Sequence, residues 1–128
     1  MTLKLSNIHI VLLAAGKSTR FKAKENKLLS KLNDKTIIEH SIEQLTKIGF
    51  KKITLVISNN SILRDIKEKD IELIKGGKTR TLSVKNALTK SKITAKYVFI
   101  HDAARILTSE KIIKKLIKET YKNKYDCI

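Results

Sequence analysis

Apolar positions recur along the chain with two periods, one typical of buried strands and the other of amphipathic helices. Mainly apolar runs predict strands at residues 8–14, 53–58, 71–74 and 97–100. Apolar residues at helical spacing predict helices at residues 36–48, about 79–91 and about 109–123, and a short helix is expected at 62–69. Gly49 follows the first of these helices and supplies a typical C-terminal stop.

Strands that alternate with helices predict an α/β fold with a mostly parallel sheet and helices on both faces. We find no repeat, linker or composition shift, so residues 1–128 are expected to form one domain. The polar stretch at residues 15–35 is expected to be a long loop. Loops of this length are uncommon inside a compact domain, and this one is therefore predicted to be functional.

Three polar or glycine-containing segments follow predicted strands, at residues 14–20, 76–83 and 101–105. Ligands of parallel α/β sheets bind outside the carboxyl ends of the strands. We therefore expect the three segments to lie on one rim and to form a single site.

The first segment indicates a phosphate-binding loop. Ala14, Ala15 and Gly16 end an apolar run, and their small side chains allow backbone N–H groups to approach anionic oxygens. Arg20 and Lys27 add positive charges that suit a triphosphate and a charged phosphorus transition state. A P-loop is disfavoured because no glycine stands five residues before Gly16. The alternative is a solvated basic loop, which is the default for a lysine in this chain.

The second segment is a glycine turn that leads into a helix. The backbone at Gly77 and Lys78 suits the polar edge of a base, and the Ser83 hydroxyl offers one hydrogen bond. The alternative is an ordinary strand-to-helix turn, which this segment taken alone favours.

The third segment ends a buried strand with a carboxylate. Asp102 is placed to hold Mg²⁺ between nucleotide phosphates, and Arg105 to bind a second phosphate. The alternative is that Asp102 caps the following turn and pairs with Arg105. His101 is expected to be a packed or hydrogen-bonded residue, and His9 and His40 receive no role.

The formal net charge of +16 raises the question of nucleic-acid binding. Only four of the 28 basic residues are arginine, and the lysines are spread over the whole chain. Aromatic residues that could stack on bases make up 5%. A lysine-rich surface with a general attraction for anionic substrates is therefore favoured over a nucleic-acid interface.

No apolar run is long enough to span a bilayer, so no membrane partner is expected. The apolar N-terminal stretch leads into a charged loop and is interpreted as a strand rather than a signal peptide. Cys127 is the only cysteine, which excludes an internal disulfide and a cysteine-based metal cage. These features predict a cytoplasmic protein.

Taken together, the three segments resemble those of the 2-C-methyl-D-erythritol 4-phosphate cytidylyltransferases of non-mevalonate isoprenoid synthesis. The matching residues are Leu13-Ala14-Ala15-Gly16-x-x-x-Arg20-Phe21, Lys27, Gly76-Gly77-x-x-Arg80-x-x-Ser83-Val84 and His101-Asp102-Ala103-Ala104-Arg105. The resemblance implies a Rossmann-like nucleotidyltransferase sheet. It also implies that the phosphate of methylerythritol phosphate attacks the α-phosphorus of CTP in line, with pyrophosphate leaving and no covalent enzyme intermediate.

The same resemblance implies roles for single residues. Arg20 and Lys27 would stabilise the transition state, Asp102 would contact Mg²⁺ and substrate, and Arg105 would hold methylerythritol phosphate. The nucleotide-binding residues that it implies are Ala14, Ala15 and Gly16 for the phosphates, Gly77, Lys78 and Ser83 for the cytosine, and Ala103 for the ribose.

Several features depart from the family pattern. The first loop lacks a second glycine, Lys27 has different neighbours, and Ile106 replaces a common proline. Some variants are similar to the bifunctional branch, in which a cyclodiphosphate synthase domain follows. Members extend well beyond residue 128 and are expected to form homodimers at full length. We therefore expect a C-terminally truncated domain that carries most of the CTP half-site and has little or no transferase activity.

Two other functions remain open. One is a cytidylyltransferase for another polyol phosphate such as ribitol 5-phosphate, whose members commonly lack the His-Asp-Ala-Ala-Arg segment. The other is a non-catalytic nucleotide-binding or nucleic-acid-binding module, which would leave the three rim segments unexplained.

Overall fold

A four-stranded parallel sheet organises the residues that the computed structural model describes, which are 4–16, 27–58 and 70–123. Its strands are β1 (Ile8–Ala14), β4 (Ile53–Ile57), β5 (Ile71–Lys75) and β6 (Tyr97–Asp102), arranged in the order β5-β4-β1-β6. All three pairings are parallel. The carboxyl ends of the strands therefore meet at one edge, and the predicted mostly parallel α/β fold is confirmed.

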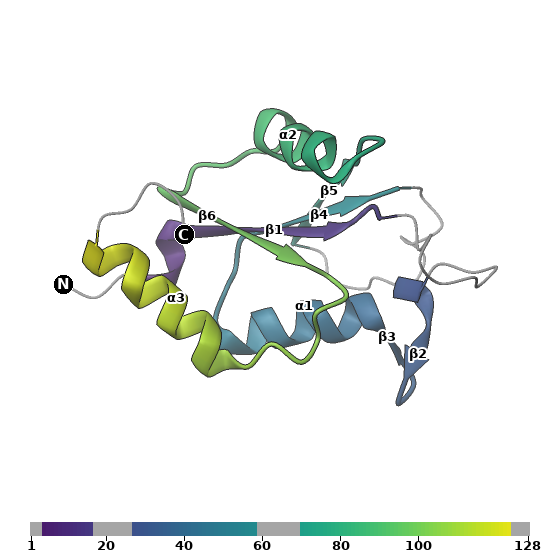
Figure 1. Cartoon of the computed structure of the whole chain (residues 1–128), viewed down its shortest axis with the longest axis horizontal. Helices are drawn as coiled ribbons and strands as arrows, with labels where there is room; N and C mark the ends of the chain where they lie inside the picture. The colour runs from purple at the N-terminus through teal and green to yellow at the C-terminus, as the bar shows by residue number, and fades with distance from the viewer. Residues whose placement is uncertain (1–3, 17–26, 59–69, 124–128) are drawn as a thin grey trace.

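Helices cover both faces of this sheet (Figure 1). Helix α2 (Arg80–Lys90) lies on one face, and α1 (Ile37–Ile48) and α3 (Glu110–Asn123) lie on the other. Strands β1 and β4 are buried on both sides, which explains why their sequences are almost continuously apolar. The larger part of the core lies under α1 and α3, and a smaller cluster of Val11, Val56 and Ala87 lies under α2.

Helix α1 has both of its predicted ends. Thr36 and Glu39 form a capping box, in which the Glu39 amide donates to Thr36 Oγ1 and the Thr36 amide donates to Glu39 Oε2. Gly49 ends the helix at a φ of 114°, a left-handed conformation that favours glycine. The predicted apolar face is buried between these ends, at Ile38, Ser41, Ile42, Leu45 and Ile48.

The prediction of a long loop at residues 15–35 is wrong for the second half of this range. Residues 27–36 form a short 3-10 helix (Lys27–Leu29) and a hairpin of β2 (Lys31–Leu32) and β3 (Lys35–Thr36). Asn33 and Asp34 make its turn with φ values of 51° and 68°. Strands of two residues are too short to show an alternating pattern, so periodicity could not reveal them.

Three other boundaries differ from the prediction or lie outside the described residues. Strand β6 continues beyond Ile100 through His101 to Asp102, because both residues pair with β1. A 3-10 helix, Leu5–Asn7, precedes β1. The helix predicted at 62–69 lies outside the described residues.

The apolar stripe predicted for α3 is only partly buried. Ile113 is fully buried and Ile117 packs against the core, whereas Ile112 is 53% and Leu116 37% exposed. Helix α3 lies beside β6, and within the described residues β6 pairs with β1 alone. An edge strand with one neighbour leaves less apolar surface for a covering helix to contact. In the described ranges, none of the helices has the length and apolarity that crossing a membrane would require.

Candidate functional site

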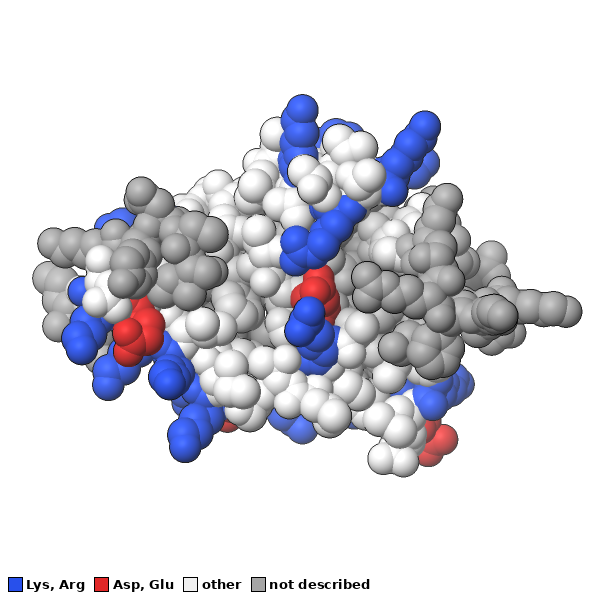
Figure 2. Space-filling model, viewed as in Figure 1, with Lys and Arg blue, Asp and Glu red and all other residues white. Residues whose placement is uncertain are grey.

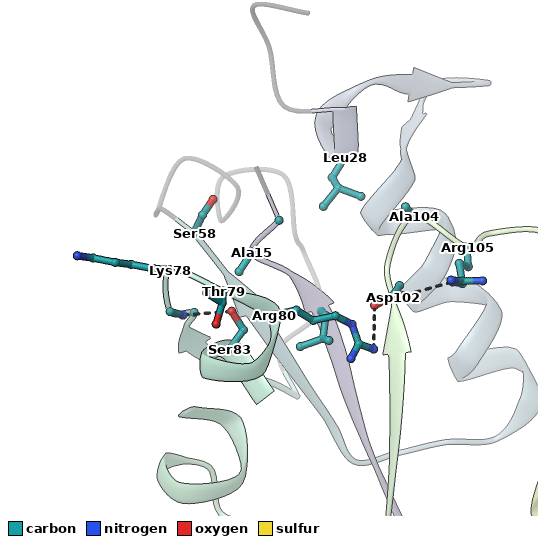
Figure 3. A pocket seen from close by; sticks show the side chains of 14 residues that line it. Ala15, Leu28, Ser58, Lys78, Thr79, Arg80, Ser83, Asp102, Ala104 and Arg105 are labelled. Carbon is teal, nitrogen blue, oxygen red and sulfur yellow. Dashed lines mark hydrogen bonds and ion pairs between the residues drawn. The ribbon is translucent and has the colours of Figure 1, made fainter. Parts of the chain in front are cut away.

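A pocket of about 930 Å³ opens at the carboxyl ends of the strands. It is bounded by the ends of β1, β4, β5 and β6 and by the first turn of α2 (Figure 3). The described residues that line it are Leu13, Ala15, Gly16, Leu28, Ser58, Gly76, Gly77, Lys78, Thr79, Arg80, Ser83, Asp102, Ala104 and Arg105. The three segments singled out in the sequence therefore contribute to one cavity, whose volume is typical of small-molecule sites.

One wall is formed where the chain leaves β5. A Cβ on Gly76 would lie 2.4 Å from the Ala15 Cβ and 2.8 Å from Ser83 Oγ, so only glycine fits there. A Cβ on Gly77 would lie 2.4 Å from the Leu82 Cβ. The two glycines are required by close packing, which brings the backbone of this turn against the end of β1.

Ser83 fixes the same turn from within α2. Its side chain is buried, and its Oγ accepts a hydrogen bond of 3.1 Å from the Gly77 amide. The hydroxyl proton is left to donate elsewhere. A polar contact thus holds the turn at the pocket wall. This geometry is consistent with both interpretations of the segment, as a site that recognises a base and as an ordinary strand-to-helix turn.

The N-terminus of α2 faces the pocket. Thr79 is its N-cap, and the hydroxyl of this residue accepts from the Leu82 amide at 3.1 Å. The partial positive charge of a helix N-terminus favours anions. Lys78 lies just before this end, although its side chain extends away from Asp102 in Figure 3.

Asp102 lies opposite, at the end of β6, and both of its carboxylate oxygens contact arginines. Arg105 Nε lies 3.2 Å from Oδ2, and a guanidinium nitrogen of Arg80 lies 3.4 Å from Oδ1. The two guanidinium groups come from opposite sides of the pocket (Figure 3). Figure 2 shows the result on the surface, where acidic atoms near the end of β6 lie between basic ones. The alternative of an Asp102–Arg105 ion pair is therefore present in the structure.

Asp102 is the one carboxylate among the pocket-lining residues that the structure describes. Over residues 4–16, 27–58 and 70–123, no three His, Cys, Asp or Glu side chains are grouped to hold a metal ion. Mg²⁺ in nucleotide sites commonly takes one or two carboxylates and completes its shell with phosphate oxygens and water. The donors present therefore fit a divalent ion that enters with a phosphate ligand, and do not fit a resident ion held by protein alone.

His101 packs beneath this end of β6, as expected. The residue is 6% exposed, its ring stacks on Phe99 with centroids 5.8 Å apart, and Phe99 stacks on Phe50. Burial lowers the pKa of His101 below its ordinary value of 6.5, against an opposing effect of the Asp102 charge. Burial also lowers the pKa of His9, whose Nε2 lies 2.7 Å from Thr54 Oγ1.

These two histidines predict that stability falls when the pH is lowered. Their folded-state pKa values lie below 6.5, so the unfolded chain binds more protons as the pH falls through and below 6.5. The melting temperature, followed by circular dichroism from pH 7.5 to pH 5, is expected to decrease below pH 6.5. His101→Gln is expected to reduce this slope, and curves of identical slope for variant and wild type would contradict the assignment.

The structure brings together seven of the residues proposed from the sequence: Ala15, Gly16, Gly77, Lys78, Ser83, Asp102 and Arg105. Ala14 and Ala103 are fully buried and do not line the pocket. The Ala103 amide donates to the Leu13 carbonyl, and its own carbonyl accepts from Ser41 Oγ. Ala104 lies at the pocket in its place. Arg20 is outside the described residues, and Lys27 begins the 3-10 helix whose next residue, Leu28, lines the pocket.

Arg80 is the main residue that the sequence reasoning did not assign to the site. Arg80 matched a position of the family motif in the sequence, but no role was assigned to it. The scarcity of arginine in a lysine-rich chain was an available signal, since two of the four arginines, Arg80 and Arg105, flank one carboxylate. Thr79, which belongs to the same segment as Arg80, lines the pocket as well, and so do Ser58 and Leu28, which no pattern in the sequence marked as site residues.

Comparisons with known proteins point to one family. Residues 8–128 match the family described as 2-C-methyl-D-erythritol 4-phosphate cytidylyltransferase. The bifunctional enzyme IspD/IspF of Campylobacter jejuni (strain 81-176) is 36% identical over 125 residues, covering 97% of this chain and 32% of that protein. The 2-C-methyl-D-erythritol 4-phosphate cytidylyltransferase of Dictyoglomus thermophilum is 40% identical over 126 residues, covering 92% of this chain and 54% of that protein.

A solved structure shows the same arrangement of elements. The bifunctional IspDF from Campylobacter jejuni aligns with a TM-score of 0.80 at 34% identity, covering 91% of this chain and 31% of that one. The chain thus spans less than two thirds of the length of these relatives. The family match extends from the first residue of β1 past the end of α3. The chain therefore belongs to the 2-C-methyl-D-erythritol 4-phosphate cytidylyltransferase family.

Proposed function

We propose that the chain binds CTP as the nucleotide half of a cytidylyltransferase that transfers CMP to 2-C-methyl-D-erythritol 4-phosphate and releases pyrophosphate. Residues 1–128 would form one partial domain of this enzyme. The observation that carries the proposal is the convergence of the segments after β1, β5 and β6 on one pocket in a chain of this family.

The turn at Gly76 and Gly77 suits the base. Close packing against Ala15 and Leu82 holds its backbone rigid, so its polar groups are fixed before a ligand arrives. The Ser83 hydroxyl, already held by the Gly77 amide, has its proton available for a cytosine acceptor. Fixed donors and acceptors distinguish bases better than mobile ones because a mismatched base leaves them unpaired.

The rest of the pocket suits phosphates. The described lining residues include three cations, Lys78, Arg80 and Arg105, against the single carboxylate of Asp102, and the N-terminus of α2 adds a partial positive charge. Backbone groups of Ala15 and Gly16 are proposed to approach the phosphates, with Ala104 near the ribose in place of Ala103. Arg20 and Lys27 are proposed to stabilise charge at the α-phosphorus in an in-line transfer without a covalent enzyme intermediate.

Asp102 is proposed to share a divalent cation, such as Mg²⁺, with the phosphates, and Arg105 to hold the phosphate of the acceptor. When bound, the ion would neutralise charge on the phosphates. The proposed acceptor, the homodimer expected of the longer relatives and the cytoplasmic location rest on the family and on the single cysteine, and are likewise proposals.

The test is a thermal-shift comparison of CTP, ATP, GTP and UTP at equal concentration with Mg²⁺. A ligand at 100 times its Kd stabilises a fold by about 2.7 kcal/mol, which corresponds to several degrees in a chain of this size. CTP is expected to give the largest shift, and Asp102→Ala to reduce it. Glu110→Ala is the control, because Glu110 is an exposed carboxylate on α3 that does not line the pocket. Equal shifts with ATP and CTP, or no shift with any nucleotide, would overturn the proposal.

A further inference from the structure

Arg80 links two elements across the mouth of the pocket. Helix α2 packs on β5, β4 and β1, whereas Asp102 ends β6 at the far edge of the sheet. The side chain of Arg80 extends from the first turn of α2 toward Asp102 and contacts Oδ1 (Figure 3). Arg105, in contrast, belongs to the turn that follows β6, where its amide also donates to the Asp102 carbonyl.

These contacts contribute little to stability. The side chains of Arg80 and Arg105 are 64% and 72% exposed, and exposed ion pairs are typically worth about 0–1 kcal/mol. The larger effect of the two arginines is on the electrostatic potential inside the pocket. A polyphosphate that enters beside an uncompensated carboxylate meets like charge, whereas a carboxylate flanked by two guanidinium groups presents a net positive charge.

We propose that Arg80 is a positioning residue that holds the Asp102 carboxylate at the side of the pocket and compensates its charge, so that a polyphosphate can bind without a divalent ion already present. The ion would then arrive with the nucleotide. This inference rests on the proposed function for the identity of the nucleotide, but its electrostatic content applies to any polyphosphate.

The test measures affinity in the presence of EDTA and of Mg²⁺, by isothermal titration calorimetry with CTP and with inorganic tripolyphosphate. Arg80→Met keeps the aliphatic stem and removes the charge. It is expected to weaken binding in EDTA about tenfold, which is about 1.4 kcal/mol, and to weaken binding in Mg²⁺ less. Arg80→Lys is expected to restore most of the loss. Lys85→Gln, which removes an exposed charge from the same helix outside the pocket, is expected to change the EDTA-to-Mg²⁺ ratio little.

A double-mutant cycle with Asp102→Asn separates this role from direct phosphate binding. If Arg80 acts through Asp102, Arg80→Met weakens tripolyphosphate binding less than about twofold in the Asp102→Asn background. An equal loss in both backgrounds would show that Arg80 contacts phosphate directly and would overturn the inference. A lower melting temperature with an unchanged EDTA-to-Mg²⁺ ratio would also overturn it, as a purely structural role.

The two proposals fail in different ways. If tripolyphosphate binds with the expected dependence on Arg80 and Asp102 but CTP binds no better than ATP, the proposed function fails and the inference stands. If CTP is preferred but its affinity in EDTA is unaffected by Arg80→Met, the inference fails and the proposed function stands. If the wild-type chain binds neither compound in EDTA, the inference fails.

Discussion

Gly76→Ala is expected to destabilise the chain by about 1–3 kcal/mol, the usual cost of adding a methyl group where none fits, and to abolish CTP stabilisation. The new Cβ would lie 2.4 Å from the Ala15 Cβ and 3.3 Å from Val56 Cγ1. Neither neighbour is the end of a long flexible side chain, so the turn itself must move. That movement would separate the turn from the end of β1 and displace Ser83. Urea unfolding and thermal shift with CTP measure the two effects.

Gly16→Ala is the matched control. Gly16 lines the same pocket, but among the described residues a Cβ there would have no neighbour within 4 Å, so the fold should lose little stability. A Gly76→Ala variant as stable as Gly16→Ala would show that the close approach of β1 and the turn is not required.

Phe50→Ala is expected to cost about 3–5 kcal/mol, a large part of the 5–15 kcal/mol that stabilises a typical domain. Phe50 is 1% exposed and stacks on Phe99, with ring centroids 6.4 Å apart. Phe99 in turn stacks on His101, the residue before Asp102. The cavity would therefore form beside Phe99 of β6. The free energy of unfolding in urea, followed by circular dichroism, measures the loss.

Two further variants keep this prediction testable if Phe50→Ala does not fold. Phe50→Leu fills most of the space and is expected to lose less than Phe50→Ala but to remain cooperative. Leu107→Ala removes a side chain that is 92% exposed and should change stability by less than about 0.5 kcal/mol. Losses of similar size at Phe50 and Leu107 would contradict the assignment of Phe50 to the core.

The sequence predicted the sheet well because its strands and helices follow regular periods. Strand β1 was apparent from an apolar run, and α1 from its helical period and from Gly49 at its C-terminal end. The hairpin at residues 31–36 was not predicted, because two-residue strands carry no period. How much of the apolar stripe of α3 is buried was not predicted, since periodicity shows which side of a helix is apolar but not how much of it meets a neighbour.

The candidate site divides in the same way. Local sequence alone marked the segments near Gly16, Gly77 and Asp102, because small residues and charges at strand ends are features of single segments. The ion pair of Arg80 with Asp102 depends on a contact between residues far apart in the chain. The conformation of the turn after β6 and a contact with Ser41 decide that Ala103 is buried and that Ala104 lies at the pocket. Periodicity and composition are properties of neighbours in sequence, so they were enough to predict the elements and to propose the class of ligand. The distance between Arg80 and Asp102 is set only when α2 packs on the sheet that contains β6. The tertiary structure alone therefore decided which charged side chains meet at the pocket.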